Sequence, residues 1–187
     1  MTKPQPWKIL ASETAFQHRW YHLRRDTVQL PNGQVIDDYF VSVRPAGALV
    51  FPVTAQGEVI FVRQYKHAAG KILLELPGGM FDADTEDPGE AAARELYEET
   101  GYSVTSISPL GTLYDNPTKD TSVVHLFLAE GAALTGQPSW DETECVEVIP
   151  IPLAEVLPKL MSGEIKVSCS VSLCFMALQV LQQRVSL

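Results

Sequence analysis

Apolar residues along the chain fall into short runs divided by turn sequences, a pattern typical of β-strands. Up to about Val43 the runs are partly polar, and the turn Pro31-Asn32-Gly33 predicts a hairpin between two of them. From Ala48 onwards the runs are more apolar, and Leu49–Val53 and Val59–Tyr65 flank a second hairpin turn. Further strands are expected at Ile72–Leu76, Val123–Ala129 and Cys145–Ile151.

The clearest helix is expected over Pro88–Thr100, because Asp87 can cap its start and Gly101 stands just past its end. Leu153–Leu160 also has a helical pattern, which Pro158 is expected to shorten or break. A last helix carries an apolar stripe made of Val171, Cys174, Leu178 and Leu181. Segments without regular structure are expected at Phe81–Asp87, Asp115–Thr121 and Ala132–Thr143.

Length and composition fit one globular domain with a small appendage: 187 residues, of which 45% are hydrophobic and 20% charged. The net charge of −9 argues against a nucleic-acid backbone or an anionic membrane surface as a partner. No apolar run is long enough to span a membrane, and the first residues lack the apolar core of a secretory signal. Cys145, Cys169 and Cys174 have no CxxC spacing, so we expect reduced thiols in a cytoplasmic protein.

The helix expected over residues 88–100 has an acidic edge. Glu95 and Glu99 share one face a turn apart, and Glu98 lies on the neighbouring edge. One interpretation is a solvated charged face in which Arg94 pairs with Glu98. The clustering of carboxylates after an expected Gly-Gly loop favours a cation site instead, because Mg²⁺ binds carboxylate oxygens together with substrate phosphates.

These residues resemble the signature of the Nudix hydrolases, Gly-x5-Glu-x7-Arg-Glu-apolar-x-Glu-Glu-x-Gly-apolar. The matching positions are Glu86, Arg94, Glu95, Leu96, Glu98, Glu99, Gly101 and Tyr102. The signature glycine should stand at position 80, which is Met80 here. Gly79 is the obvious equivalent, so the segment before Glu86 is one residue longer than in the signature.

Further stretches resemble the ADP-ribose pyrophosphatase branch of this family: Val62–His67, Leu74–Pro77 and Gly163–Ile165. The resemblance implies an α/β fold, with a Nudix α/β/α sandwich and a mixed sheet over residues 46–187. It also implies a small N-terminal antiparallel β-sheet over residues 1–45 that takes part in a homodimer.

In this family the signature helix holds divalent metal against a diphosphate. The resemblance therefore implies Mg²⁺, with Mn²⁺ as an alternative, in two or more ions per site. Arg94 and Glu86 are expected to orient the carboxylates, and Glu98 is either a further ligand or the partner of Arg94. The implied metal ligands are the carbonyl of Gly78 and the carboxylates of Glu95, Glu99 and Glu144.

An acidic stretch around residues 140–148 takes the place of the loop that supplies the catalytic base in ADP-ribose pyrophosphatases. By this similarity Glu142 is the base and Glu144 is a metal ligand, and the alternative is a solvated acidic loop. The preceding segment has few apolar anchors and contains Gly136 and Pro138, so it is expected to be mobile.

Two residues are candidates for substrate binding. Arg63 ends an apolar strand and either pairs with a phosphate or forms an ordinary surface salt bridge. Pro117 follows the signature at a distance typical of the ADP-ribose subclass, although the residues next to it differ from those common there. Four aromatic residues either stack on a base or pack in a dimer or core: Trp7, Phe16, Trp20 and Tyr21.

The resemblance implies hydrolysis of ADP-ribose, or of a related nucleoside diphosphate sugar, to two monophosphates. The alternatives within the family are another sugar nucleotide and a nucleoside triphosphate. A different class of function is a Nudix domain that senses a nucleotide without cleaving it. Sensors can lose one of the signature glutamates, whereas this chain keeps Glu95, Glu98 and Glu99.

Overall fold

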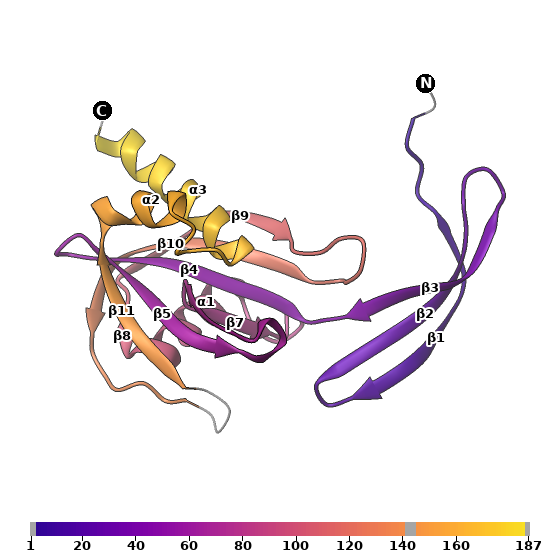
Figure 1. Cartoon of the computed structure of the whole chain (residues 1–187), viewed down its shortest axis with the longest axis horizontal. Helices are drawn as coiled ribbons and strands as arrows, with labels where there is room; N and C mark the ends of the chain where they lie inside the picture. Colours follow the sequence, from indigo (N-terminus) through magenta and orange to yellow (C-terminus); the bar gives the residue numbers. More distant parts are fainter. Residues whose placement is uncertain (1–2, 141–144, 186–187) are drawn as a thin grey trace. The chain divides into compact units, whose positions relative to one another are not determined.

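The computed structural model describes residues 3–140 and 145–185 (Figure 1). The chain divides into two compact units. The first unit comprises Met1–Pro45 and Tyr114–Ser122, and the second comprises Ala46–Leu113 and Val123–Leu187.

The first unit contains an antiparallel three-stranded sheet in its described part, ordered β1-β2-β3. Its strands are β1 (Lys8–His18), β2 (Tyr21–Gln29) and β3 (Val35–Val43). The expected turn at residues 31–33 joins β2 to β3, and Gly33 adopts a φ of +88° there. Every residue of β1 is exposed, and within the described strands of this sheet only Asp26 and Val28 are buried. The prediction of a strand-rich N-terminal region is confirmed.

The second unit is built on a mixed sheet, since β10 runs parallel to β4 and the other described pairs are antiparallel. The path through the sheet is β11-β5-β4-β10-β8, with β6 paired to β5, β7 to β4 and β9 to β10. The strands are β4 (Ala46–Thr54), β5 (Glu58–Lys66), β6 (Lys71–Glu75), β7 (Gly78–Phe81), β8 (Tyr102–Ser103), β9 (Ser106–Tyr114), β10 (Val123–Leu134) and β11 (Val146–Pro152).

Helices cover both faces of this sheet (Figure 1). Alternate residues of β4 point to opposite sides: Leu49 and Phe51 pack in the core with α2 and α3, whereas Ala48 and Val50 pack in the core with α1. The helices are α1 (Pro88–Thr100), α2 (Leu153–Met161) and α3 (Ser168–Val185), with a short 3-10 helix, η1 (His67–Ala69). The expected α/β/α sandwich with a mixed sheet is confirmed. No helix in the described residues is long and apolar enough to cross a membrane.

Three details of the expected secondary structure are wrong. The Gly-Gly pair at residues 78–79 lies in β7, antiparallel to β4, instead of in a loop. The strand β9 lies between α1 and the next expected strand, in a stretch where none is expected. The segment Ala132–Thr143 is not structureless throughout, because β10 continues to Leu134 and residues 135–140 hydrogen-bond to the end of α1.

Candidate active site

The acidic edge lies on α1, whose bounds follow from local chemistry. The Asp87 side chain accepts hydrogen bonds from the N–H groups of Gly89 and Glu90, at 2.8 and 3.3 Å, and Pro88 takes the first helical position. At the other end Gly101 has a φ of +75°, and its N–H donates to the carbonyl of Tyr97 at 2.8 Å. The sequence prediction of this helix is confirmed at both ends.

Arg94 joins three carboxylates of the signature. Its Nε and Nη2 atoms donate to the two oxygens of Glu86 at 2.8 and 3.0 Å, as a bidentate pair. Its Nη1 atom donates to Glu95 and to Glu98, both at 2.9 Å. These bonds hold the pKa of the Glu86 carboxyl below its ordinary value and raise the pKa of Arg94 further. Arg94 thus fixes the directions in which Glu95 and Glu98 point.

Glu99 is buried, with 5% of its surface exposed. Its Oε2 atom accepts the N–H of Gly78 in β7 at 3.0 Å. Burial raises the pKa of Glu99 to about 8; the charges of Glu95 and Glu75 raise it too, whereas the Gly78 N–H and Lys66 lower it. Negative charge is therefore gathered around a carboxylate that water barely reaches.

Two consecutive glycines let β7 lie against its neighbours. Gly78 has a φ of +155°, and a side chain there would overlap the backbone of β4 at Ala48. A side chain at Gly79 would overlap the carboxylate of Glu95. Gly79 stands one position before the place of the signature glycine and is its equivalent here. Glu95 packs against this residue.

Two residues near Glu99 were not expected from the sequence. Lys66, at the end of β5, forms an ion pair with Glu75 in β6, and its Nζ atom lies 2.8 Å from Oε1 of Glu75. This oxygen is buried and has no partner with hydrogen-bond geometry among the described residues. Glu75 is 8% exposed, and both charges act on the pKa of Glu99. A carboxylate at the end of an apolar strand, two residues before Pro77, was the available signal.

The structure describes two of the remaining expected site residues, Arg63 and Pro117. Arg63 Nη1 forms an ion pair of 2.9 Å with Oε2 of Glu147, and both side chains are exposed. Pro117 belongs to the first unit, in the segment that hydrogen-bonds to the end of β3. Glu142 and Glu144 lie outside the described residues.

A divalent metal is the group that the signature implies here. Within residues 3–140 and 145–185, no three His, Cys, Asp or Glu side chains gather closely enough to hold a metal by themselves. The residues present nevertheless fit a hard cation. Glu99 and Glu95 both lie against β7, at Gly78 and Gly79, and offer oxygen donors alone. Burial first, and then the charges of Glu95 and Glu75, raise the pKa of Glu99, and a cation next to its carboxylate would offset these effects.

Comparison with known proteins agrees with this arrangement. A model of the NUDIX domain matches residues 43–169, and a model of the nucleoside diphosphate sugar hydrolase N-terminal domain matches residues 7–42. The ADP-ribose pyrophosphatase of Bacillus subtilis (strain 168) is 33% identical over 159 residues, 84% of this chain and 85% of that protein. A GDP-mannose pyrophosphatase of Yersinia enterocolitica is 32% identical over 166 residues, 79% of this chain and 82% of that protein.

A solved structure shares the fold. The crystal structure of an ADP compounds hydrolase superposes with a TM-score of 0.86 at 24% identity, covering 98% of both chains. The NUDIX match spans more than half of the sequence, and its signature carboxylates meet at Arg94 and β7. The chain therefore belongs to the Nudix family of hydrolases, which generally depend on divalent metal.

Proposed function

We propose that the chain is a metal-dependent pyrophosphohydrolase that splits ADP-ribose, or a related nucleoside diphosphate sugar, into two monophosphates. The observation that carries this proposal is the pair of carboxylates on α1, Glu95 and Glu99, set against the glycine strand β7. The names of the two relatives support the substrate class, because ADP-ribose and GDP-mannose are both nucleoside diphosphate sugars.

The proposed cofactor is Mg²⁺, with Mn²⁺ as an alternative, in two or more ions. When bound, such ions neutralise the diphosphate oxygens and lower the pKa of a water molecule. Carboxylate and carbonyl oxygens are the donors that these cations prefer. The residues proposed to hold them are Gly78 through its carbonyl, Glu95, Glu99 and Glu144.

Arg94 is proposed to keep the acidic edge in one arrangement. A single guanidinium nitrogen, Nη1, holds Glu95 and Glu98 at the same distance of 2.9 Å, so neither carboxylate can turn without breaking a charged hydrogen bond. Glu86 anchors the other edge of the guanidinium. Such support for metal ligands typically contributes about 10- to 100-fold in metal affinity or activity.

Removal of the proton from the attacking water is proposed for Glu142, with Glu98 as the alternative base. Glu98 is the more exposed partner of Arg94, at 43% of its side chain, so it is open to water. Glu142→Gln is expected to lower turnover while metal affinity stays near wild type, and Glu144→Gln is expected to lower both. Turnover and Mn²⁺ titration of each variant test this assignment. If Glu142→Gln behaves like wild type while Glu147→Gln is inactive, the base has been assigned to the wrong residue.

Arg63 and Pro117 are proposed to contact the substrate. The ion pair of Arg63 with Glu147 is exposed on both sides, and such pairs contribute only about 0–1 kcal/mol. A diphosphate oxygen can therefore replace Glu147 as the partner of the guanidinium at small cost. Arg63→Ala is expected to raise KM more than it lowers kcat.

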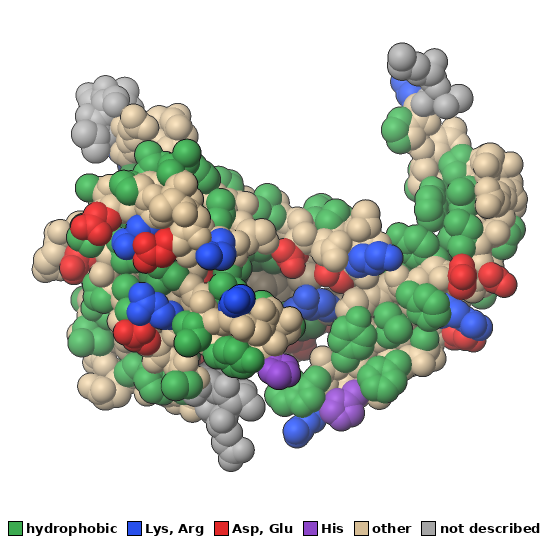
Figure 2. Space-filling view, viewed as in Figure 1, with side chains coloured by type: hydrophobic (Ala, Val, Ile, Leu, Met, Phe, Trp, Pro, Cys, Tyr) green, Lys and Arg blue, Asp and Glu red, His purple; other side chains and the backbone are tan. Residues whose placement is uncertain are grey.

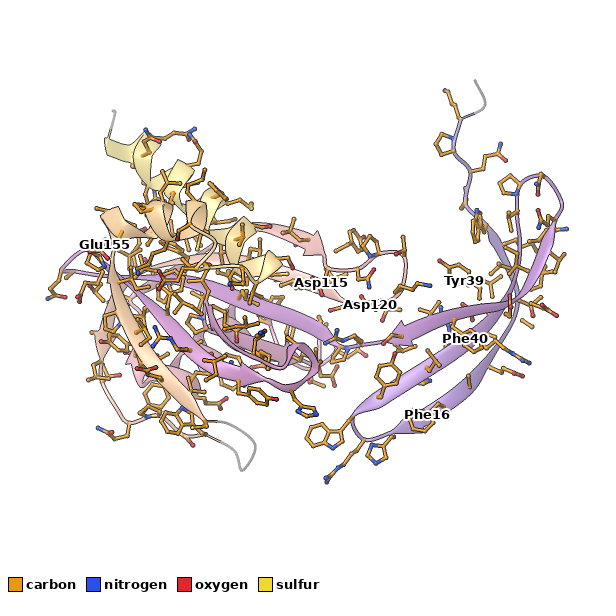
Figure 3. All side chains as sticks on the ribbon, in the orientation of Figure 1. Phe16, Tyr39, Phe40, Asp115, Asp120 and Glu155 are labelled. Carbon is orange, nitrogen blue, oxygen red and sulfur yellow. The ribbon has the colours of Figure 1, made fainter. Side chains whose placement is uncertain are left out.

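We also propose that residues 1–45 form a β-strand region that serves dimerisation or an edge of the substrate site, and that residues 46–187 form the Nudix hydrolase domain. Hydrophobic side chains are exposed over the first unit's sheet, among them Phe16 and Phe40 (Figures 2 and 3). A three-stranded sheet with two buried residues has little core of its own, so a second copy would supply the missing contacts. Light scattering at micromolar concentration tests this, and a monomer would contradict it.

One assay decides the main proposal. A panel of ADP-ribose, other nucleoside diphosphate sugars and nucleoside triphosphates is incubated with the chain and Mg²⁺ or Mn²⁺, and the phosphorylated products are identified. Cleavage of none of them, with nucleotide binding retained, would favour a sensing domain. A cytoplasmic location is part of the same proposal, and the free thiols of Cys145 and Cys174 support it.

A further inference from the structure

The end of α1 receives hydrogen bonds from a segment far along the chain. A helix leaves its last carbonyls without partners inside the helix. Here the backbone N–H of Ser139 donates to the carbonyl of Glu98 at 2.8 Å. The indole Nε1–H of Trp140 donates to the carbonyl of Glu99 at 3.0 Å. The two residues whose backbones are bonded in this way are the last two glutamates of the acidic edge.

The same segment, residues 135–140, is fitted closely to this helix end. The N–H groups of Thr135 and Gly136 both donate to the carbonyl of Gly101, at 3.0 and 3.1 Å. A side chain at Gly101 would come within 2.6 Å of the carbonyl oxygen of Gly136, and one at Gly136 would overlap the hydroxyl of Tyr97. The contact therefore depends on two glycines and fixes the register of the segment on the helix.

The position of the last turn decides where the Glu99 carboxylate lies. Helix ends fray readily, and no basic side chain stands in the last turn of α1 to bind its carbonyls. Glu99 must nevertheless reach the Gly78 N–H at 3.0 Å, next to Glu95. Catalytic side chains need placement within about 0.5 Å, so a partner that holds this turn has a direct effect on the site.

We propose that Trp140 is a positioning residue: its indole N–H holds the last turn of α1 so that Glu99 keeps the place required for metal binding. The inference rests on the proposed function. Trp140 is 45% exposed, so burial of its ring in a core does not account for the residue, whereas its single donor meets a helix carbonyl that lacks an intrahelical partner.

The test is Mn²⁺ binding to the purified full chain without nucleotide, followed by electron paramagnetic resonance. Trp140→Phe keeps an aromatic ring and removes the donor, so its Mn²⁺ dissociation constant is expected to rise about tenfold. Ser139→Ala is the matched control, because Ser139 donates through its backbone, and its dissociation constant is expected to stay within about twofold of wild type.

Kinetics separate positioning from simple loss of stability. With the preferred substrate, Trp140→Phe is expected to lower kcat at limiting Mn²⁺, to recover most of it at saturating Mn²⁺, and to leave the substrate KM nearly unchanged. Because Mn²⁺ also stabilises a folded protein that binds it, thermal unfolding without metal is measured as well, and Trp140→Phe is expected to remain folded at the assay temperature. A Trp140→Phe protein that binds Mn²⁺ within twofold of wild type overturns the proposal.

A second variant covers the case in which Trp140→Phe does not fold. Gly136→Ala pushes residues 135–140 away from Tyr97, so this variant is also expected to bind Mn²⁺ more weakly than the wild type. Wild-type Mn²⁺ binding by Gly136→Ala overturns the proposal. Failure of the proposed hydrolytic function can be told apart from failure of the proposed role of Trp140. If the wild type binds Mn²⁺ but cleaves no member of the panel, the function is wrong, while the effect of Trp140 on metal binding is still measured.

Discussion

Replacement of Glu99 by glutamine removes a charge at the buried end of α1 while almost preserving shape. The amide oxygen of the variant can still accept the N–H of Gly78, so the fold is retained. The substitution takes one anionic oxygen from the proposed metal site beside Glu95. Turnover is expected to fall at least about 100-fold.

In metal-free protein the same substitution is expected to stabilise the fold. Burial raises the pKa of Glu99 from 4.5 to about 8, so the folded state binds this proton more tightly than the unfolded state does. The stability that Glu99 contributes is fully present below pH 4.5 and is lost as the pH rises through about 8. The difference, 8 − 4.5 = 3.5, sets a ceiling of about 5 kcal/mol at about 1.36 kcal/mol for each pH unit.

The assay is thermal unfolding in a metal chelator, together with turnover at saturating Mg²⁺. If about 2 kcal/mol of this ceiling is realised near pH 9, the Glu99→Gln protein unfolds about 4–8 °C above the wild type there. The advantage is expected to disappear near pH 4.5, where Glu99 itself is neutral. Glu90→Gln is the matched control, because Glu90 is exposed on the same helix. Wild-type turnover in the Glu99→Gln protein would refute the metal role, and a lower unfolding temperature near pH 9 would refute the electrostatic argument.

Two further substitutions test the surroundings of the site. Gly79→Ala is expected to lower kcat at least about tenfold, since its methyl group displaces the Glu95 carboxylate. Gly47→Ala is the control, because its added carbon would lie 3.7 Å from the nearest atoms. The kcat of this control is expected to stay near wild type in the same assay. Ser170→Ala is expected to cost about 1–3 kcal/mol in urea unfolding, because the buried Ser170 Oγ accepts the N–H of Leu76 at 3.0 Å; an unchanged unfolding midpoint would contradict this.

The helix α1 could be predicted to the residue because its determinants are local. A capping aspartate, a proline at the first position and a glycine after the last one act within a few residues of each end. The strand β7 could not be predicted in this way. Its sequence, Gly78–Phe81, has weak strand propensity, and it is a strand because it pairs with β4 about thirty residues earlier in the chain.

The same limit applies to the site. The carboxylates of the signature could be placed on one edge of α1 from their spacing. Glu98 pairs with Arg94, which is one of the two roles that the sequence left open for Glu98. Lys66 and Glu75 were missed, because they meet only through the register of β5 and β6. Trp140 was missed as well, since a hydrogen bond to a residue 41 positions earlier leaves no local pattern.

The burial of Glu99 is a further feature that spacing could have revealed. Glu99 follows Ala92 by seven positions and Leu96 by three, which places it on the stripe of α1 that packs in the core. A leucine at this position would satisfy the packing pattern at no electrostatic cost. A carboxylate there raises its own pKa and opposes folding once it is charged, so packing alone does not explain the residue. An ionisable group on the core stripe of a helix, aimed at a backbone N–H of a glycine strand, is best explained by a cation that offsets its charge.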